Sequence, residues 1–128
     1  MPLAKALVVR VEDRPGMLGE IAAALGAKEV NLRALHGSNE NGQGVVRMVV
    51  DKLAVAKQVL GEHGWVPEEE EVLEVELSDE PGALGFAAKA LGNAGVNIKY
   101  VFVTTGGSKK VTAFVAVSDM KSALQALW

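Results

Sequence analysis

The chain has 128 residues, which is within the usual range for one domain. An apolar fraction of 49% and a charged fraction of 23% predict a globular protein with a buried core and argue against disorder. Thirteen basic and sixteen acidic residues give a net charge of −3, so a strongly basic surface for nucleic acid is excluded. The absence of cysteine excludes disulfides, thiolate nucleophiles and Cys-ligated zinc.

The first apolar run, "MPLAKALVVRVE", is interrupted by Lys5 and Arg10 and is too short for a signal peptide or a membrane span. We therefore expect a cytoplasmic protein with no membrane partner. Within this run, Leu7, Val9 and Val11 alternate with residues of the other face, which predicts a strand with one buried face.

The next segments predict a complete supersecondary unit. An apolar stripe at helical spacing from Leu18 to Leu25 predicts a helix. The β-rich runs "VNLRALHG" and "VVRMVV" flank a polar cluster with glycines, "SNENGQG", and so predict a hairpin. "DKLAVAKQVLGEHG" opens with Asp51 near a plausible N-cap and predicts a second helix, after which "WVPEEEE" predicts a short fourth strand.

The chain then repeats itself. A shift of 66 residues, with no gap, brings identical residues into register through strand, turn and helix, which indicates a duplicated unit. The aligned identities include Asp13, Pro15, Gly16, Leu18, Gly19 and Asn31 with Asp79, Pro81, Gly82, Leu84, Gly85 and Asn97. The second unit ends in "SDMKSALQALW", again with an aspartate near the expected helix start, and has no counterpart of the fourth strand.

The predicted fold class is α+β. We expect two ferredoxin-like βαββαβ units in tandem, residues 1–69 and 70–128, each an antiparallel sheet with helices on one face. The second unit lacks its last strand. Its open edge invites a partner strand from this chain or from a second copy, and we expect a homodimer.

The repeated turns "EDRPGMLGEI" and "SDEPGALGFA" suggest a ligand site in each unit. A proline at the first helical position would leave the first amides of each helix bare, and such amides bind carboxylates. The preceding aspartate could accept hydrogen bonds from an ammonium group, and an asparagine at the start of the second strand could add a polar contact, directly or from a neighbouring unit. The candidate residues are Asp13, Gly16, Met17, Leu18 and Asn31 in one unit, and Asp79, Gly82, Ala83, Leu84 and Asn97 in the other.

Ordinary turn chemistry also explains these residues. An aspartate before Pro-Gly is a common cap-and-turn device, and an asparagine before a strand is a common turn residue. Taken residue by residue, this structural interpretation carries at least as much weight as the functional one.

The two motifs together, "DRPGMLGEIAAAL…VNL" and "DEPGALGFAAKAL…VNI", resemble the signature of ACT domains. The resemblance implies a regulatory module that binds an amino acid at interfaces between units, with no cofactor and with a regulated enzyme as a further partner. The chain departs from the pattern at Lys28 and Glu29, where the second unit has Ala-Gly, and in the missing last strand.

Three functions remain open. The first is a non-enzymatic amino-acid sensor, and the second is an assembly module of the same fold that binds no ligand. The third, a small hydrolase, lacks a nucleophile. The two histidines, His36 and His63, fall in different elements without cysteine or spaced carboxylate partners, so we expect no metal site.

Overall fold

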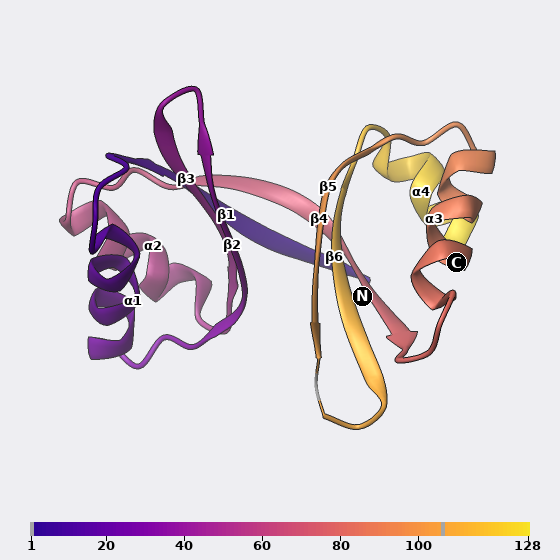
Figure 1. Cartoon of the computed structure of the whole chain (residues 1–128), viewed down its shortest axis with the longest axis horizontal. Helices are drawn as coiled ribbons and strands as arrows, with labels where there is room; N and C mark the ends of the chain where they lie inside the picture. The colour runs from indigo at the N-terminus through magenta and orange to yellow at the C-terminus, as the bar shows by residue number, and fades with distance from the viewer. Residues whose placement is uncertain (1, 106) are drawn as a thin grey trace. The chain divides into compact units, whose positions relative to one another are not determined.

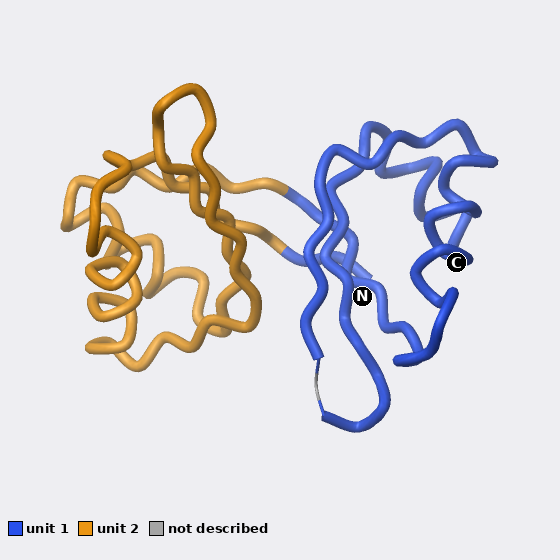
Figure 2. The backbone as a smooth tube through the Cα atoms, in the orientation of Figure 1, with its two compact units in different colours: residues 1–4, 71–128 blue, residues 5–70 orange. Residues whose placement is uncertain are grey.

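A computed structural model describes residues 2–105 and 107–128. The chain divides into two compact units (Figure 2). Residues 5–70, drawn in orange and keyed as unit 2, are called the N-terminal unit below. Residues 71–128 together with residues 1–4, drawn in blue and keyed as unit 1, are called the C-terminal unit.

The N-terminal unit is a ferredoxin-like fold. Its strands follow the order β2-β3-β1 with β4 next to β1, and the β1–β3 and β2–β3 pairs are antiparallel. Helices α1 and α2 cover one face of the sheet (Figure 1). Its elements are β1 (Leu3–Val11), α1 (Met17–Ala27), β2 (Leu32–Glu40), β3 (Gln43–Val50), α2 (Leu53–Glu62) and the first residues of β4 (Glu68–Ser78).

The C-terminal unit repeats this arrangement. Strand β6 lies between β4 and β5 and is antiparallel to both, and α3 and α4 pack on one face of the sheet (Figure 1). Its elements are the remainder of β4, α3 (Ala83–Asn93), β5 (Ile98–Thr105), β6 (Lys110–Val117) and α4 (Met120–Leu127). The predicted tandem α+β fold is confirmed, and none of the described helices is long and apolar enough to span a membrane.

Each unit has its own apolar core between helices and sheet. In the N-terminal unit Leu7, Ile21 and Met48 are fully buried, as the alternating and helical patterns predict. In the C-terminal unit Leu73 and Leu91 occupy the corresponding place. The two separate cores show that each repeat packs its own helices on its own sheet.

Strand β4 joins the two units without a break. The predicted fourth strand of the first repeat and the predicted first strand of the second form one strand of 11 residues. The C-terminal unit lacks a last strand of its own, and residues 2–4 take that place beside β4. The Glu74 N–H donates to the Pro2 carbonyl oxygen over 2.8 Å, and Leu3 packs against the core of this unit.

A type II β-turn starts the first helix of each unit. The Met17 N–H donates to the Arg14 carbonyl oxygen at 3.2 Å, and Gly16 has φ 85° and ψ −6°, which are the values of the third turn residue. The C-terminal unit repeats the turn: the Ala83 N–H donates to the Glu80 carbonyl oxygen at 3.2 Å, and Gly82 has φ 88° and ψ −8°.

This turn corrects the expected role of the proline. The helices begin at Met17 and Ala83, so Pro15 and Pro81 lie two residues before the first helical residue. Proline there presets φ for the second position of the turn, and glycine at the next position supplies the positive φ that other L-residues avoid. The Pro-Gly pair is therefore a turn device that leads into the helix.

The second helices differ in their caps. Asp119 caps α4, since its carboxylate accepts from the Ser122 N–H at 3.1 Å. The prediction for Asp51 is wrong: Lys52 is the N-cap of α2, and the Asp51 carboxylate instead accepts from the Asn31 N–H at 2.9 Å. The exposed Asn31 N–H, just before β2, takes the aspartate side chain that would otherwise cap the helix.

Because residues 2–4 lie beside β4 of the C-terminal unit, a substitution there should affect a unit that is distant in the sequence. Leu3→Ala should destabilise the C-terminal unit by roughly 1–2 kcal/mol, less than the about 2–5 kcal/mol of a fully buried leucine, because Leu3 is partly buried against that core. Hydrogen exchange of the β6 amides should accelerate. Val66→Ala, at a side chain 77% exposed, is the matched control and should change nothing. Unchanged β6 protection in Leu3→Ala would contradict the strand assignment.

The turn makes a second prediction. Gly16→Ala should destabilise the protein by about 1–2 kcal/mol, because a Cβ is disfavoured in the left-handed region, although a Cβ there would meet no atom within 4 Å. Gly19→Ala is the control: it lies inside α1 in equally open space and should stabilise by about 1 kcal/mol. Urea unfolding measures both, and equal effects of the two substitutions would count against the turn.

Candidate functional site

The first-turn amides of α1 are only partly free. The Met17 N–H is bonded within the turn, so the expectation of three bare amides is wrong for this residue. Among the residues that the structure describes, the N–H groups of Gly16 and Leu18 have no acceptor. The Met17 side chain is 7% exposed and belongs to the core, whereas Leu18 is 48% exposed. The Gly19 N–H has no acceptor among these residues either, so the available donors are Gly16, Leu18 and Gly19.

Helix α3 shows the same division. The Ala83 N–H is bonded within the turn, and the N–H groups of Gly82 and Leu84 have no acceptor within residues 2–105 and 107–128. A Cβ built on Gly82 meets no atom within 4 Å, so open space lies before this turn. The Gly85 N–H is likewise without an acceptor there, so each unit presents unpaired amides on both sides of the turn bond, near the positive end of a helix dipole, an arrangement that attracts an anionic group.

Asp13 stands beside its turn and is held there by the hairpin of the same unit. The Asn39 side-chain amide donates to Asp13 Oδ2 at 2.6 Å, and Asn39 Oδ1 accepts from the Gly42 N–H at 3.2 Å. Asn39 therefore ties the β2–β3 hairpin to the loop before α1. This contact leaves Asp13 Oδ1 without a hydrogen-bond donor in the described part of the chain, so a carboxylate oxygen remains available.

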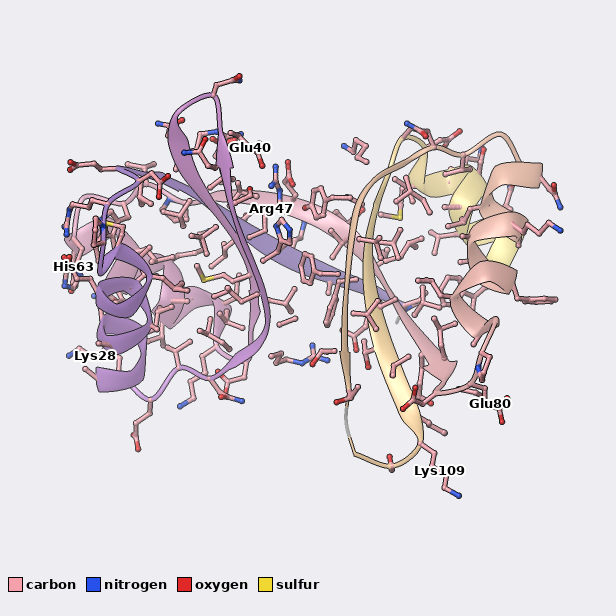
Figure 3. The ribbon with its side chains drawn as sticks, viewed as in Figure 1. Lys28, Glu40, Arg47, His63, Glu80 and Lys109 are labelled. Carbon is pink, nitrogen blue, oxygen red and sulfur yellow. The ribbon has the colours of Figure 1, made fainter. Side chains whose placement is uncertain are left out.

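Asp79 is placed by its backbone. Its N–H donates to the Lys109 carbonyl oxygen at 2.8 Å, which ties this loop to the β5–β6 hairpin. Figure 3 shows Glu80, the next residue, and Lys109 at the same end of the C-terminal unit. The Asp79 carboxylate has no partner among the described residues. In each unit the loop before the first helix is therefore bonded to the hairpin of that unit, through a side chain in the N-terminal unit and through the backbone in the C-terminal unit.

Asn31 lies at the opposite end of its unit from Asp13. Asn39, near the end of β2, pairs with Gly44 of β3, and Gly44 also pairs with Val11 at the end of β1, close to Asp13. Asn31 precedes the first residue of β2 and so lies at the other end of the strand. Eight residues separate the two asparagines along the strand, roughly 26 Å at the usual rise per residue. Figure 3 shows Lys28, after α1, and Glu40, in the hairpin, at opposite ends of this unit. The structure does not bring Asn31 to Asp13 within the unit.

The two strand-entry asparagines share a backbone anchor. Asn31 exchanges hydrogen bonds with Asp51 through its N–H and carbonyl groups, at 2.9 and 3.1 Å. Asn97 does the same with Ser118, at 2.9 Å for both bonds. Both residues are exposed, and their side-chain amides make no hydrogen bond within the described part of the chain. The backbone is held while the side chain stays available.

Charge distinguishes the two turns. Arg14 Nη1 lies 2.6 Å from Glu20 Oε2, and this hydrogen bond lowers the pKa of Glu20 and raises the pKa of Arg14. Glu20 stands in the first turn of α1, whereas α3 has no acidic residue in its first turn and carries the exposed Phe86 in the matching position. An anion at α3 therefore meets no acidic side chain from the helix itself.

The histidines have structural surroundings. His63 Nδ1 lies 2.9 Å from the Val59 carbonyl oxygen, and its ring stacks on Trp65 with centroids 4.9 Å apart. His36 is on β2, opposite Arg47 of β3. Within residues 2–105 and 107–128, no group of three or more acidic or histidine side chains is placed to hold a metal ion.

Comparison with known proteins relates part of the chain to a known domain family. Residues 5–63 match the ACT domain model. None of the curated protein sequences matches the chain.

Solved structures show the same fold over nearly the whole chain. Protein BT0572 from Bacteroides thetaiotaomicron is 24% identical, with a TM-score of 0.90 over 98% of this chain and 87% of that chain. The regulatory subunit of aspartate kinase from Thermus thermophilus is 16% identical, with a TM-score of 0.69 over 98% and 91% of the two chains. Residues 5–63 therefore resemble an ACT domain, and the C-terminal unit repeats the fold and the first-turn motif of this matched segment.

Proposed function

We propose that the protein is a non-enzymatic sensor that binds a free amino acid at the first-turn motif of each unit. The observation that supports this most strongly is the repeated pairing of unbonded amides with a carboxylate in the same loop. The α-carboxylate of the ligand accepts hydrogen bonds from Gly16 and Leu18, or from Gly82 and Leu84. Its ammonium group donates to Asp13 Oδ1 or to Asp79.

The asparagines enter from a neighbouring copy. Because Asn31 and Asn97 lie at the far ends of their own units, each contacts a ligand that is held by a different unit, which this proposal assigns to a second molecule. A homodimer completes the sites in this proposal, and the ligand then couples amino-acid concentration to association. The unpaired side-chain amides of both asparagines suit this role, since each donates and accepts.

Regulation is the natural use of such a site. The ACT domain match and the fold shared with a regulatory subunit of aspartate kinase support a module that signals to an enzyme. Two serine hydroxyls donate to a carboxylate, Ser38 to Glu40 in a strand and Ser122 to Asp119 in a helix cap, and both bonds are local and exposed, which supports a module without catalysis of its own.

A thermal-shift panel of the twenty proteinogenic amino acids tests the proposal. At least one should raise the melting temperature in a saturable way, since a ligand that binds only the folded state stabilises it. Asp79→Asn should raise the half-saturating concentration about tenfold or more, because a hydrogen bond to a charged group contributes about 1.5–3 kcal/mol.

Glu80→Gln is the matched control. It removes the same charge one residue away, and Glu80 serves the turn through its carbonyl oxygen, so the response should persist. No shift with any amino acid at millimolar concentration, together with concentration-dependent dimerisation, would instead identify a ligand-independent assembly module.

A further inference from the structure

The C-terminal unit contains an apolar cavity of about 90 Å³ between α3 and its sheet. Every side chain that lines it is aliphatic. Leu84 and Val101, on α3 and on the edge strand β5, are 43% and 38% exposed and mark the side from which the cavity is reached. The lining residues are Val75, Leu77, Leu84, Ala87, Ala88, Leu91, Ile98, Val101, Ala113, Val115 and Leu127.

The cavity has a specific origin on α3. Ala87 is the fifth residue of this helix, and the fifth residue of α1, which has the same length, is Ile21. Ile21 is fully buried in the core of the N-terminal unit. An alanine in place of isoleucine removes three carbon atoms from the helix face that packs on the sheet.

The sheet also carries smaller side chains beneath this part of α3. The cross-strand pair Val9 and Val46 of the N-terminal unit corresponds to the pair Val75 and Ala113 of the C-terminal unit. Likewise, the pair Leu35 and Met48 corresponds to the pair Val101 and Val115. At three of these positions the C-terminal unit has the smaller side chain, and all three border the cavity: Val101, Ala113 and Val115.

The aliphatic lining favours apolar contents. It supplies no polar partners for water, so an apolar group that displaces water from it gains affinity. A cavity of about 150 Å³ accommodates benzene, with six carbon atoms, so a volume of about 90 Å³ admits about three or four heavy atoms, the size of an isopropyl group.

We propose that the C-terminal unit binds a small branched aliphatic group in this cavity, and that the N-terminal unit, where Ile21 stands in place of Ala87, does not. The group belongs either to a free apolar molecule or to the side chain of an amino acid. This binding goes beyond the sensor function, because it depends on the space under α3 and on none of the first-turn amides.

Xenon alone is the first probe, followed through methyl resonances of the full chain. Xenon should shift the Leu77, Leu91 and Val101 methyls in a saturable way and leave those of Leu25 and Leu35 in place. Ala87→Ile, which restores the side chain of Ile21, should abolish the shifts and raise the melting temperature. Ala113→Val adds less volume and should weaken the shifts, which keeps the test decisive if the larger substitution disturbs folding.

Ala23→Ile is the matched control, since it adds the same side chain at an exposed position of α1 and should leave the xenon response intact. Absent shifts at the cavity methyls, or equal shifts in both units, would overturn the proposal, whatever the thermal-shift panel shows.

A second experiment determines whether the bound aliphatic group belongs to an amino acid or to a free apolar molecule. L-valine and L-leucine are compared with isobutane and with L-alanine on the same methyls. Shifts with valine or leucine that Ala87→Ile removes assign the group to an amino acid, whereas shifts with isobutane alone assign it to a free apolar molecule. Amino-acid binding that Ala87→Ile leaves unchanged, together with no response to xenon or isobutane, overturns the cavity site and leaves the sensor function standing.

Discussion

The left-handed glycine before each first helix is the constraint on which the site depends. At Gly16 and Gly82 a positive φ lets the chain leave its first strand, close a type II turn and enter a helix within four residues. The same geometry uses up the middle amide, at Met17 or Ala83, and leaves an amide on either side unpaired. The turn that shapes the fold therefore also selects the donors that face solvent.

The hairpin that follows holds this loop from outside. In the N-terminal unit the contact is a side-chain bond between Asn39 and Asp13, and in the C-terminal unit it is a backbone bond between Asp79 and Lys109. Two chemically different contacts at the same place in the fold indicate that the position of the loop matters more than the particular bond. The cores of the two units differ as well, since Ile21 of the N-terminal unit is buried at the position where Ala87 borders the cavity of the C-terminal unit.

The sequence predicted the parts of the fold that depend on local patterns. Alternating strands, apolar helical stripes and the internal repeat gave the two ferredoxin-like units and the missing last strand, because each follows from residue spacing. The origin of the replacement strand could not be read in this way. Residues 3 and 4 are the first residues of β1, whose remainder belongs to the N-terminal unit, and no local signal tells that they pair with the edge of the C-terminal unit.

The sequence predicted where the turns of the candidate site lie, but not which residues contact them. Asp-x-Pro-Gly marks the loop, but the sequence does not show that Gly16 adopts a positive φ, which places Pro15 in the turn before the helix. The contact between Asn39 and Asp13 depends on strand register, and Asp51 was misassigned as a cap because its competing partner, the Asn31 amide, is distant in sequence. Register and long-range pairing are set by the packed sheet, which a single sequence does not display.

The central claim is that the amides on either side of the turn bond hold the carboxylate of an amino acid. An ¹⁵N-resolved titration with the amino acid that gives the largest thermal shift tests it most directly. The account predicts saturable downfield shifts of the Gly16 and Leu18 amide protons, or of Gly82 and Leu84, with Met17 or Ala83 shifting far less. Equal shifts of all three amides, or shifts confined to other parts of the chain, would contradict it.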